Sequence, residues 1–245
     1  GEGCRELMEL VLEGIEPEPE VDESRDRAIR IAIIGRPNVG KSTLVNRLIG
    51  EERVIASEVP GTTRDSIFVP FSRDERDFVL IDTAGVRRRS RVEDDVERAS
   101  VTKTLQAIDK AHVVIFVCDA HDVIGEQDAS VLGLALNRGR ALLIAVNKWD
   151  GIPMEQREDI RRQLELKLDF VPYAPVHFIS ARHGTGVGEL VQATIKAYDA
   201  AMREIPTPVL TKTLERAIQQ HQPPMVRGRR IKLRYAHQGG RNPPR

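Results

Sequence analysis

The chain has 245 residues, of which 40 % are hydrophobic, 4 % aromatic and 30 % charged, with 37 basic and 37 acidic side chains. These values allow a folded core and favour a soluble α/β protein. The two cysteines, Cys4 and Cys118, form no CxxC motif, which argues against structural zinc and against a disulfide-dependent secreted fold. No apolar run approaches the roughly 20 residues of a membrane span and no signal peptide is visible, so we expect a cytoplasmic protein without a membrane partner.

The first 28 residues combine an amphipathic stretch with an acidic one. Within residues 1–15, Leu7, Met8 and Val11 share one helical face, which predicts a short helix that needs a packing partner. Residues 16–28 contain EPEPEVDESRD, which is acidic and interrupted by proline, and this predicts an exposed linker. Ten acidic residues and three arginines give residues 1–28 a net charge of −7.

Strand and helix patterns alternate from residue 29 to residue 205, which predicts a mostly parallel sheet with helices on both faces. The runs IFVPF (67–71) and FVLI (78–81) flank the charged turn SRDERD, and this spacing predicts a hairpin with one antiparallel edge strand. The other expected strands are 29–34, 113–118, 142–146 and 176–179, and the expected helices lie near 43–49, 92–109, 127–138, 155–168 and 187–203.

Pro206 and Pro208 end this region. A helix is predicted at 209–220 and a strand in RIKLRYA (230–236), and we expect residues 206–245 to be the first part of a second domain because these elements are too few to close a core. Nine Lys or Arg residues and one Glu give this segment a net charge of +8. Such charge asymmetry is typical of a chain that meets a polyanion at one end, and an ordinary solvated surface remains the alternative.

The stretch GRPNVGKS fits the pattern G-x-x-x-x-G-K-[ST] and lies between a predicted strand and a predicted helix. In such a loop the backbone N–H groups surround phosphates, Lys41 reaches the β- and γ-phosphate oxygens, and the Ser42 hydroxyl can bind Mg²⁺. The phosphate-binding candidates here are Gly35, Arg36, Pro37, Asn38, Val39, Gly40, Lys41, Ser42 and Thr43.

The motif DTAG (82–85) ends the next long apolar run, 41 residues after Lys41. Asp82 can hold Mg²⁺ through water, and the N–H of Gly85 can contact a γ-phosphate. The remaining phosphate-binding candidates are Thr83, Ala84 and Val86.

NKWD (147–150) and SAR (180–182) each follow a predicted strand. The Asp150 carboxylate can accept hydrogen bonds from N1–H and the N2 amine of guanine, a donor pair that adenine lacks. The Lys148 stem can lie against the base, and a backbone N–H of SAR could meet guanine O6. The predicted ligand is therefore a guanine nucleotide, and the candidate residues are Asn147, Lys148, Asp150, Ser180, Ala181 and Arg182.

The ordered set GRPNVGKS, DTAG, NKWD and SAR resembles the translation-factor-related GTPases over residues 29–205. PGTTRD (60–65) is similar to the switch I motif of that group, and the resemblance implies that one of its threonines completes the Mg²⁺ shell when GTP is bound. Thr63 is our choice, and the adjacent Thr62 is the alternative.

The residue after DTAG differs from Ras-like enzymes, which carry a glutamine there to orient the attacking water. The Val86 side chain has no polar atom and cannot do so, which implies slow intrinsic hydrolysis or another positioning group. GTPases that share GxPN and TTRD use a potassium ion near the asparagine, so this resemblance implies K⁺ beside Asn38, and an ordinary turn residue is the alternative. The catalytic candidates are Lys41, Asn38, Thr63 and Gly85.

Four positions are identical when residues 1–12 (GEGCRELMELVL) are aligned with residues 184–195 (GTGVGELVQATI). The second stretch follows SAR, where the last helix of a G domain is expected, so the chain begins with a stretch similar to such a helix. Two G domains, an acidic linker between them and a basic third domain are the organisation of the EngA/Der family of bacterial GTPases, which the chain resembles over nearly its whole length. The resemblance implies the last helix of a preceding, absent G domain (1–15), a linker (16–28), a GTP-binding G domain (29–205) and a truncated KH-like RNA-binding segment (206–245).

The same resemblance implies a GTPase that acts in assembly of the large ribosomal subunit. Its implied ligands are GTP or GDP, Mg²⁺ and K⁺, and its implied partners are that subunit, its RNA and a second G domain in the full-length protein. Two alternatives are a GTP-gated RNA-binding module with incidental hydrolysis and an Era-like GTPase that joins a G domain to a KH domain. The RNA-binding candidates are Arg227, Arg229, Arg230, Lys232 and Arg234.

Overall fold

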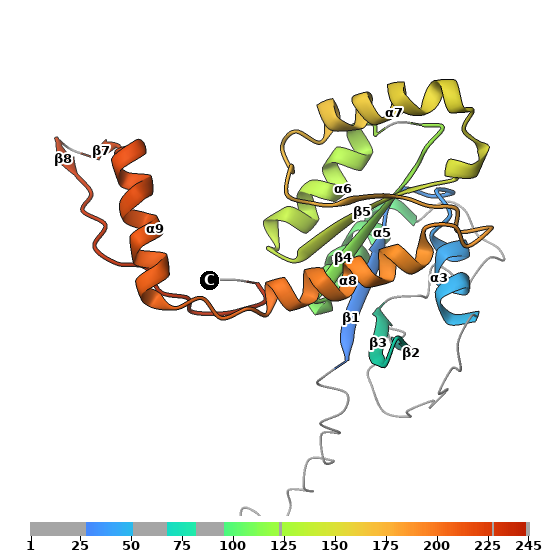
Figure 1. Cartoon of the computed structure of the whole chain (residues 1–245), viewed down its shortest axis with the longest axis horizontal. Helices are drawn as coiled ribbons and strands as arrows, with labels where there is room; N and C mark the ends of the chain where they lie inside the picture. The colour runs from blue at the N-terminus through green and yellow to red at the C-terminus, as the bar shows by residue number, and fades with distance from the viewer. Residues whose placement is uncertain (1–27, 51–67, 82–95, 123, 227, 244–245) are drawn as a thin grey trace, which may run out of the picture.

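The computed structural model describes residues 28–50, 68–81, 96–122, 124–226 and 228–243, and most of these build one six-stranded sheet with helices on both faces (Figure 1). The strand order is β2-β3-β1-β4-β5-β6, and every neighbouring pair except β2 and β3 is parallel. The predicted α/β fold with a mostly parallel sheet is therefore confirmed. The strands are β1 Ile29–Ile34, β2 Phe68–Arg73, β3 Arg76–Ile81, β4 Val113–Asp119, β5 Ala141–Asn147 and β6 Val176–Phe178.

The predicted hairpin forms the antiparallel edge of the sheet. Arg73 of β2 lies opposite Arg76 of β3, so Asp74 and Glu75 alone make the turn. Both have positive φ, 50° and 60°, which is the backbone twist that a two-residue hairpin turn requires.

Two layers of helices bury the sheet because its central strands are apolar on both sides. Along β4, Val113, Ile115 and Val117 pack in the cluster that includes α3 and α8, and the alternate residues pack in the cluster that includes α5, α6 and α7. The helices are α3 Lys41–Gly50, α5 Val96–Lys110, α6 Glu126–Asn137, α7 Met154–Lys167 and α8 Val187–Ala201.

The parallel strands bring the sequence motifs to the same end of the sheet, where these strands have their carboxyl ends. GRPNVGKS follows β1, NKWD begins at the last residue of β5, and SAR comes two residues after β6. Carboxyl ends of parallel strands share an edge of the sheet, where open α/β folds bind ligands.

The C-terminal segment contains α9 Thr207–Gln220 and the short strands β7 Met225–Val226 and β8 Arg229–Arg230, and these elements lie away from the sheet (Figure 1). The strand predicted for 230–236 is wrong beyond Arg230. Its alternating apolar residues, Ile231, Leu233 and Tyr235, are exposed, and among the described residues no strand pairs with them. An alternating pattern becomes a strand only where a neighbour supplies backbone hydrogen bonds.

Asn242, near the end of this segment, contacts residues beside the sheet. Asn242 Nδ2 donates to the His112 carbonyl at 3.1 Å, and Arg140 Nη1 donates to the Asn242 carbonyl at 2.9 Å. His112 is buried and accepts from the Arg30 N–H. In the part of the chain described by the structure, no helix is long and apolar enough to cross a membrane.

Candidate functional site

The loop from Gly35 to Gly40 lies against the ends of β4 and β5. A Cβ atom added to Gly35 would stand 2.2 Å from the Val117 carbonyl oxygen, and one added to Gly40 would stand 2.1 Å from Asn147 Nδ2. Gly35, Asn38 and Gly40 all have positive φ. Glycine at the two contact positions therefore allows both the close approach and the backbone path.

Lys41, the first residue of α3, curls back over this loop. Its Nζ donates to the carbonyl oxygens of Gly35 and Arg36 at 2.7 and 2.6 Å, and burial lowers the pKa of its ammonium group. Ser42 and Thr43 follow in the first turn of α3. The Arg36 side chain points elsewhere, because its guanidinium pairs with Asp122 and Asp128.

Asn147 joins the loop after β1 to the loop after β6. Its Nδ2 donates to the Val39 carbonyl at 2.8 Å, and its Oδ1 accepts from the Ala181 N–H at 2.9 Å. The side chain is buried, and both contacts span more than thirty residues of sequence. Guanine O6 would therefore have to share the Ala181 donor or use another N–H of the SAR loop.

Lys148 has φ of 65° and reaches Asp119, the last residue of β4, with its Nζ 2.5 Å from the carboxylate. Burial alone would raise the pKa of Asp119, but the hydrogen bonds from Lys148 and His121 outweigh it and lower that pKa. Asp119 is thus ionised at neutral pH and holds the Lys148 ammonium group.

Asp150 lies in the short helix η1 Trp149–Gly151, with its side chain partly exposed. The hydrogen bond from Ser180 is the main cause of its lowered pKa, and the charges of His183 and Arg182 add to it. His183 Nε2 lies 3.2 Å from the Asp150 carboxylate. The side chain predicted to read guanine is therefore an ionised acceptor beside the SAR loop.

Arg47 of α3 also binds the SAR loop, through two backbone carbonyls. Its Nε donates to the Ala181 carbonyl at 3.2 Å, and its Nη2 donates to the Arg182 carbonyl. Ser180 and Ala181 are buried, whereas Arg182 is exposed. The structure thus brings the predicted residues of the loops after β1, β5 and β6 together around one edge of the sheet.

Several predicted site residues lie outside the described residues, so the structure does not place them. These are Thr62, Thr63, Asp82, Thr83, Ala84, Gly85, Val86 and Arg227. Of the predicted Mg²⁺ ligands, only Ser42 is described. Within the described ranges, no group of three or more His, Cys, Asp or Glu side chains could hold a metal ion.

The sequence analysis missed Asp119, Arg47, Asp122 and Asp128. Asp119 carried a detectable signal, because it ends an apolar strand at the same edge as the other motifs. Arg47 and Asp128 lie inside helices, and their partners are 134 and 92 residues away, so no local pattern identifies them.

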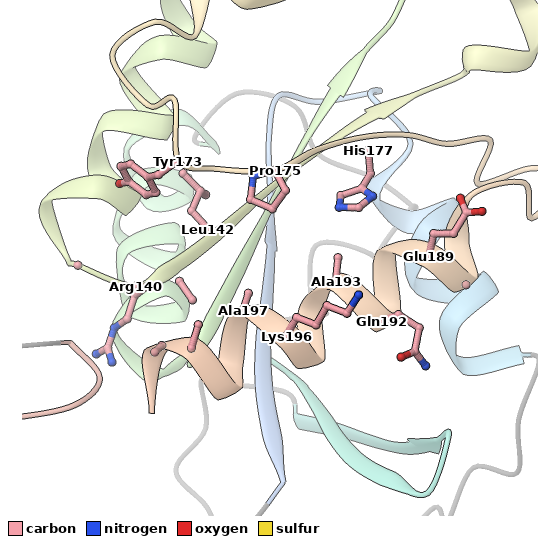
Figure 2. Close-up of a pocket in the computed structure, with 15 residues that line it drawn as sticks. Arg140, Leu142, Tyr173, Pro175, His177, Glu189, Gln192, Ala193, Lys196 and Ala197 are labelled. Carbon is pink, nitrogen blue, oxygen red and sulfur yellow. The ribbon is translucent and has the colours of Figure 1, made fainter. Parts of the chain in front are cut away.

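A hollow of about 1000 Å³ lies between α8 and the strands β5 and β6, away from these residues (Figure 2). Figure 2 shows Ala193 and Ala197 of α8 facing Leu142 and Pro175 across it. None of the predicted nucleotide-binding residues lines this hollow, so its size does not make it the nucleotide site.

Comparison with known families supports the interpretation of the motifs. Residues 30–148 match the family model described as 50S ribosome-binding GTPase. Residues 204–245 match the model described as the C-terminal KH-domain-like region of EngA bacterial GTPase enzymes.

Relatives named GTPase Der match almost the whole chain. The protein from Thioalkalivibrio sulfidiphilus is 61 % identical over 231 residues, which cover 92 % of this chain and 50 % of that protein. The protein from Serratia proteamaculans is 57 % identical over 234 residues, which cover 95 % and 47 % respectively. The chain therefore spans about half the length of these relatives.

Among solved structures, Era in complex with MgGDPNP and nucleotides 1506–1542 of 16S ribosomal RNA aligns with a TM-score of 0.53 at 25 % identity. The alignment covers 70 % of this chain and 57 % of that one.

Proposed function

This chain belongs to the EngA/Der family of bacterial GTPases, and on that basis we propose that it binds GTP and GDP at the edge formed by the loops after β1, β5 and β6. The observation that carries the proposal is Asn147, whose one amide contacts both the phosphate-binding loop GRPNVGKS (35–42, the P-loop) and the SAR loop. A phosphate-binding loop and a base-reading loop are thereby fixed at a set distance, as a nucleoside polyphosphate requires.

On the phosphate side, Lys41 is the group that would meet the β- and γ-phosphates. It now donates to the carbonyls of Gly35 and Arg36, and bound phosphate oxygens would give its ammonium group stronger, charged acceptors. Ser42, at the start of α3, would hold Mg²⁺ together with Asp82 and a switch I threonine, Thr63 or Thr62. The metal ion would supply charge neutralisation for the phosphates.

On the base side, Asp150 would accept from N1–H and the N2 amine of guanine. Lys148 would lie along the base, and Asp119 keeps its ammonium group in place. The SAR loop, held by Arg47 and Asn147, would close the base site.

The test is Asp150→Asn, with Asp159→Asn on the exposed face of α7 as the matched control. Two charge-assisted hydrogen bonds at about 1.5–3 kcal/mol each predict a loss of GTP affinity on the order of 10²–10⁴-fold. The amide introduced by Asp150→Asn offers a donor, so xanthosine triphosphate should be favoured relative to GTP. Equal affinities of the variant and the control for GTP would refute the base-reading role.

Hydrolysis of GTP to GDP and phosphate is proposed to be slow and stimulated by K⁺. The Val86 side chain has no polar atom to orient water, and Asn38 is an exposed residue in the P-loop with φ of 63°. Turnover should be faster in KCl than in NaCl at equal ionic strength, and Asn38→Ala should remove the difference. Equal rates in the two salts would exclude potassium from the mechanism.

We further propose a role in assembly of the large ribosomal subunit, supported by the description of the matched family as ribosome-binding. Arg230, Lys232 and Arg234 are exposed and could contact RNA phosphates, and Arg227 and Arg229 are the other candidates. Each phosphate contact should add about 0.7–0.9 to the slope of log affinity against log salt concentration. A flat salt dependence in sedimentation with 50S subunits would argue against RNA contact by this segment.

Two alternatives are separated by further observations. A GTP-gated RNA-binding module with incidental hydrolysis would bind subunits in a nucleotide-dependent way without stimulated turnover. An Era-like protein is less well supported, because the C-terminal segment matches the EngA-type model. A second G domain in the full-length protein is proposed on the length of the relatives, of which the chain spans about half.

A further inference from the structure

Asp128 is a fully buried carboxylate that the proposed nucleotide contacts do not use. It is 0 % exposed and lies in the first turn of α6, where its Oδ2 accepts from the Gly125 N–H at 3.1 Å. The same oxygen lies 2.8 Å from Arg36 Nε. Among the described residues, neither Asp128 Oδ1 nor Arg36 Nε has a hydrogen-bond partner, so the contact between the two side chains is an ion pair without hydrogen-bond geometry. A buried charge is strongly unfavourable without a counter-charge, so Asp128 depends on Arg36.

Arg36 is the second residue of the P-loop, and its side chain turns away from the loop toward the segment between β4 and α6. Besides Asp128, its Nη1 lies 2.8 Å from the Asp122 carboxylate and its Nη2 donates to the Asp122 carbonyl at 3.3 Å. Asp122 is two-thirds exposed whereas Asp128 is not exposed at all, so the contact with Asp128 is the better shielded from water and salt.

The guanidinium anchors a loop with an uncommon backbone conformation. Gly35, Asn38 and Gly40 have φ of 144°, 63° and 99°, a region that L-residues rarely occupy. Arg36 lies between the first two, and its carbonyl accepts from Lys41 Nζ. A side chain fixed at this position limits where the neighbouring N–H groups can point, and those N–H groups are the donors that a phosphate would use.

We propose that Arg36 and Asp128 form a positioning pair that holds the P-loop in the conformation that binds nucleotide phosphates. The inference rests on the proposed binding of GDP and GTP and assigns a role in that site to α6. Neither side chain touches the nucleotide in this proposal, since both act through the backbone of residues 35–38. The competing explanation is a buried ion pair that stabilises the fold and has no effect on the site.

A double-mutant cycle separates the two explanations. The variants are Arg36→Gln, Asp128→Asn and the double variant, which replaces the ion pair by two neutral amides, with Asn matching Asp in size and Gln shorter than Arg. Arg36→Lys keeps the positive charge but not the guanidinium, so it tests whether charge alone restores binding. Arg138→Gln is the matched control, because Arg138 pairs with Asp109 at 2.9 Å on an exposed surface at the end of α6. For each chain, the affinity for GDP and IDP and the melting temperature without nucleotide are measured.

Arg36→Gln leaves the Asp128 charge buried without its partner, so this variant should lose both thermal stability and GDP affinity. The double variant should recover the melting temperature and still bind GDP roughly tenfold or more weakly than the wild type, which separates positioning from stability. Arg36→Lys keeps the positive charge but has only one nitrogen for the two carboxylates, so it should bind GDP more tightly than Arg36→Gln and more weakly than the wild type. The GDP-to-IDP preference should not change in any variant, because Asp150 and the SAR loop are untouched.

The proposal is overturned if the double variant binds GDP as the wild type does, or if affinity follows melting temperature across the whole series. Should the double variant not fold, wild-type-like affinity in the singly substituted Asp128→Asn chain would overturn it equally. A wild-type chain that does not bind GDP would refute the proposed function itself, which is a distinguishable result.

Discussion

Replacing Asn147 by alanine should weaken both the fold and the nucleotide site, because this buried amide makes two long-range hydrogen bonds. The substitution leaves the Val39 carbonyl and the Ala181 N–H without their partner. An unsatisfied buried polar group costs about 1–3 kcal/mol, so two such groups predict a loss of about 2–4 kcal/mol when water partly replaces the lost contacts. At about 2–4 °C per kcal/mol for a domain of this size, the melting temperature should fall by roughly 4–16 °C.

The assay is thermal unfolding of the nucleotide-free chain followed by circular dichroism. Asn137→Ala is the matched control, because Asn137 is an exposed residue at the end of α6. Asn147→Asp keeps an acceptor for Ala181 but turns a carboxylate oxygen toward the Val39 carbonyl, so it should not restore stability. If Asn147→Ala melts together with the control, the amide does not hold the two loops and the reasoning is wrong.

Three other predictions test separate features of the structure. Gly40→Ala should weaken GDP binding by roughly tenfold or more, because its Cβ would stand 2.1 Å from Asn147 Nδ2 at a φ of 99°, and fluorescence titration with labelled GDP would show this. Burial lowers the pKa of His177 from its ordinary 6.5, so the unfolded chain takes up the proton first and stability declines as the pH falls below about 6.5. Urea unfolding at about pH 7.5 and about pH 5.5 should show this decline in the wild type and not in His177→Asn. Burial and the nearby charges of Asp128 and Asp119 raise the pKa of the Cys118 thiol to about 12, so iodoacetamide should label Cys118 in denaturant and leave it unmodified in the native protein, as peptide mass analysis would reveal.

The sheet could be predicted from the sequence because its signals are local. The run that forms β4 has six buried residues in succession, a pattern typical of a parallel strand covered on both faces. The hairpin was predictable from two apolar runs around a short charged turn, and Asp74 and Glu75 supply that turn. The shared position of the P-loop, NKWD and SAR at one edge then follows from parallel topology.

Interactions between distant charged residues could not be predicted in the same way. Arg36 pairs with a carboxylate 92 positions later, and only the packing of the β4–α6 connection beside β1 makes them neighbours. The C-terminal segment shows the opposite problem. Residues 231–235 have the alternating pattern of a strand, but no described strand pairs with them, so the pattern predicted more structure than forms.

The contacts around the site divide the proposed recognition of a guanine nucleotide into parts that substitutions can separate. Asp150 faces only the base side, so its loss should change the preference between guanine and other bases. The Arg36 side chain contacts Asp128 of α6, and its backbone belongs to the phosphate-binding loop, so Arg36 has no contact on the base side. Its loss should therefore lower the affinities for GDP and IDP by the same factor. Asn147 belongs to both sides, because one amide bonds the P-loop and the SAR loop. Its loss should therefore lower the affinity and the base preference together, since neither loop then limits the position of the other.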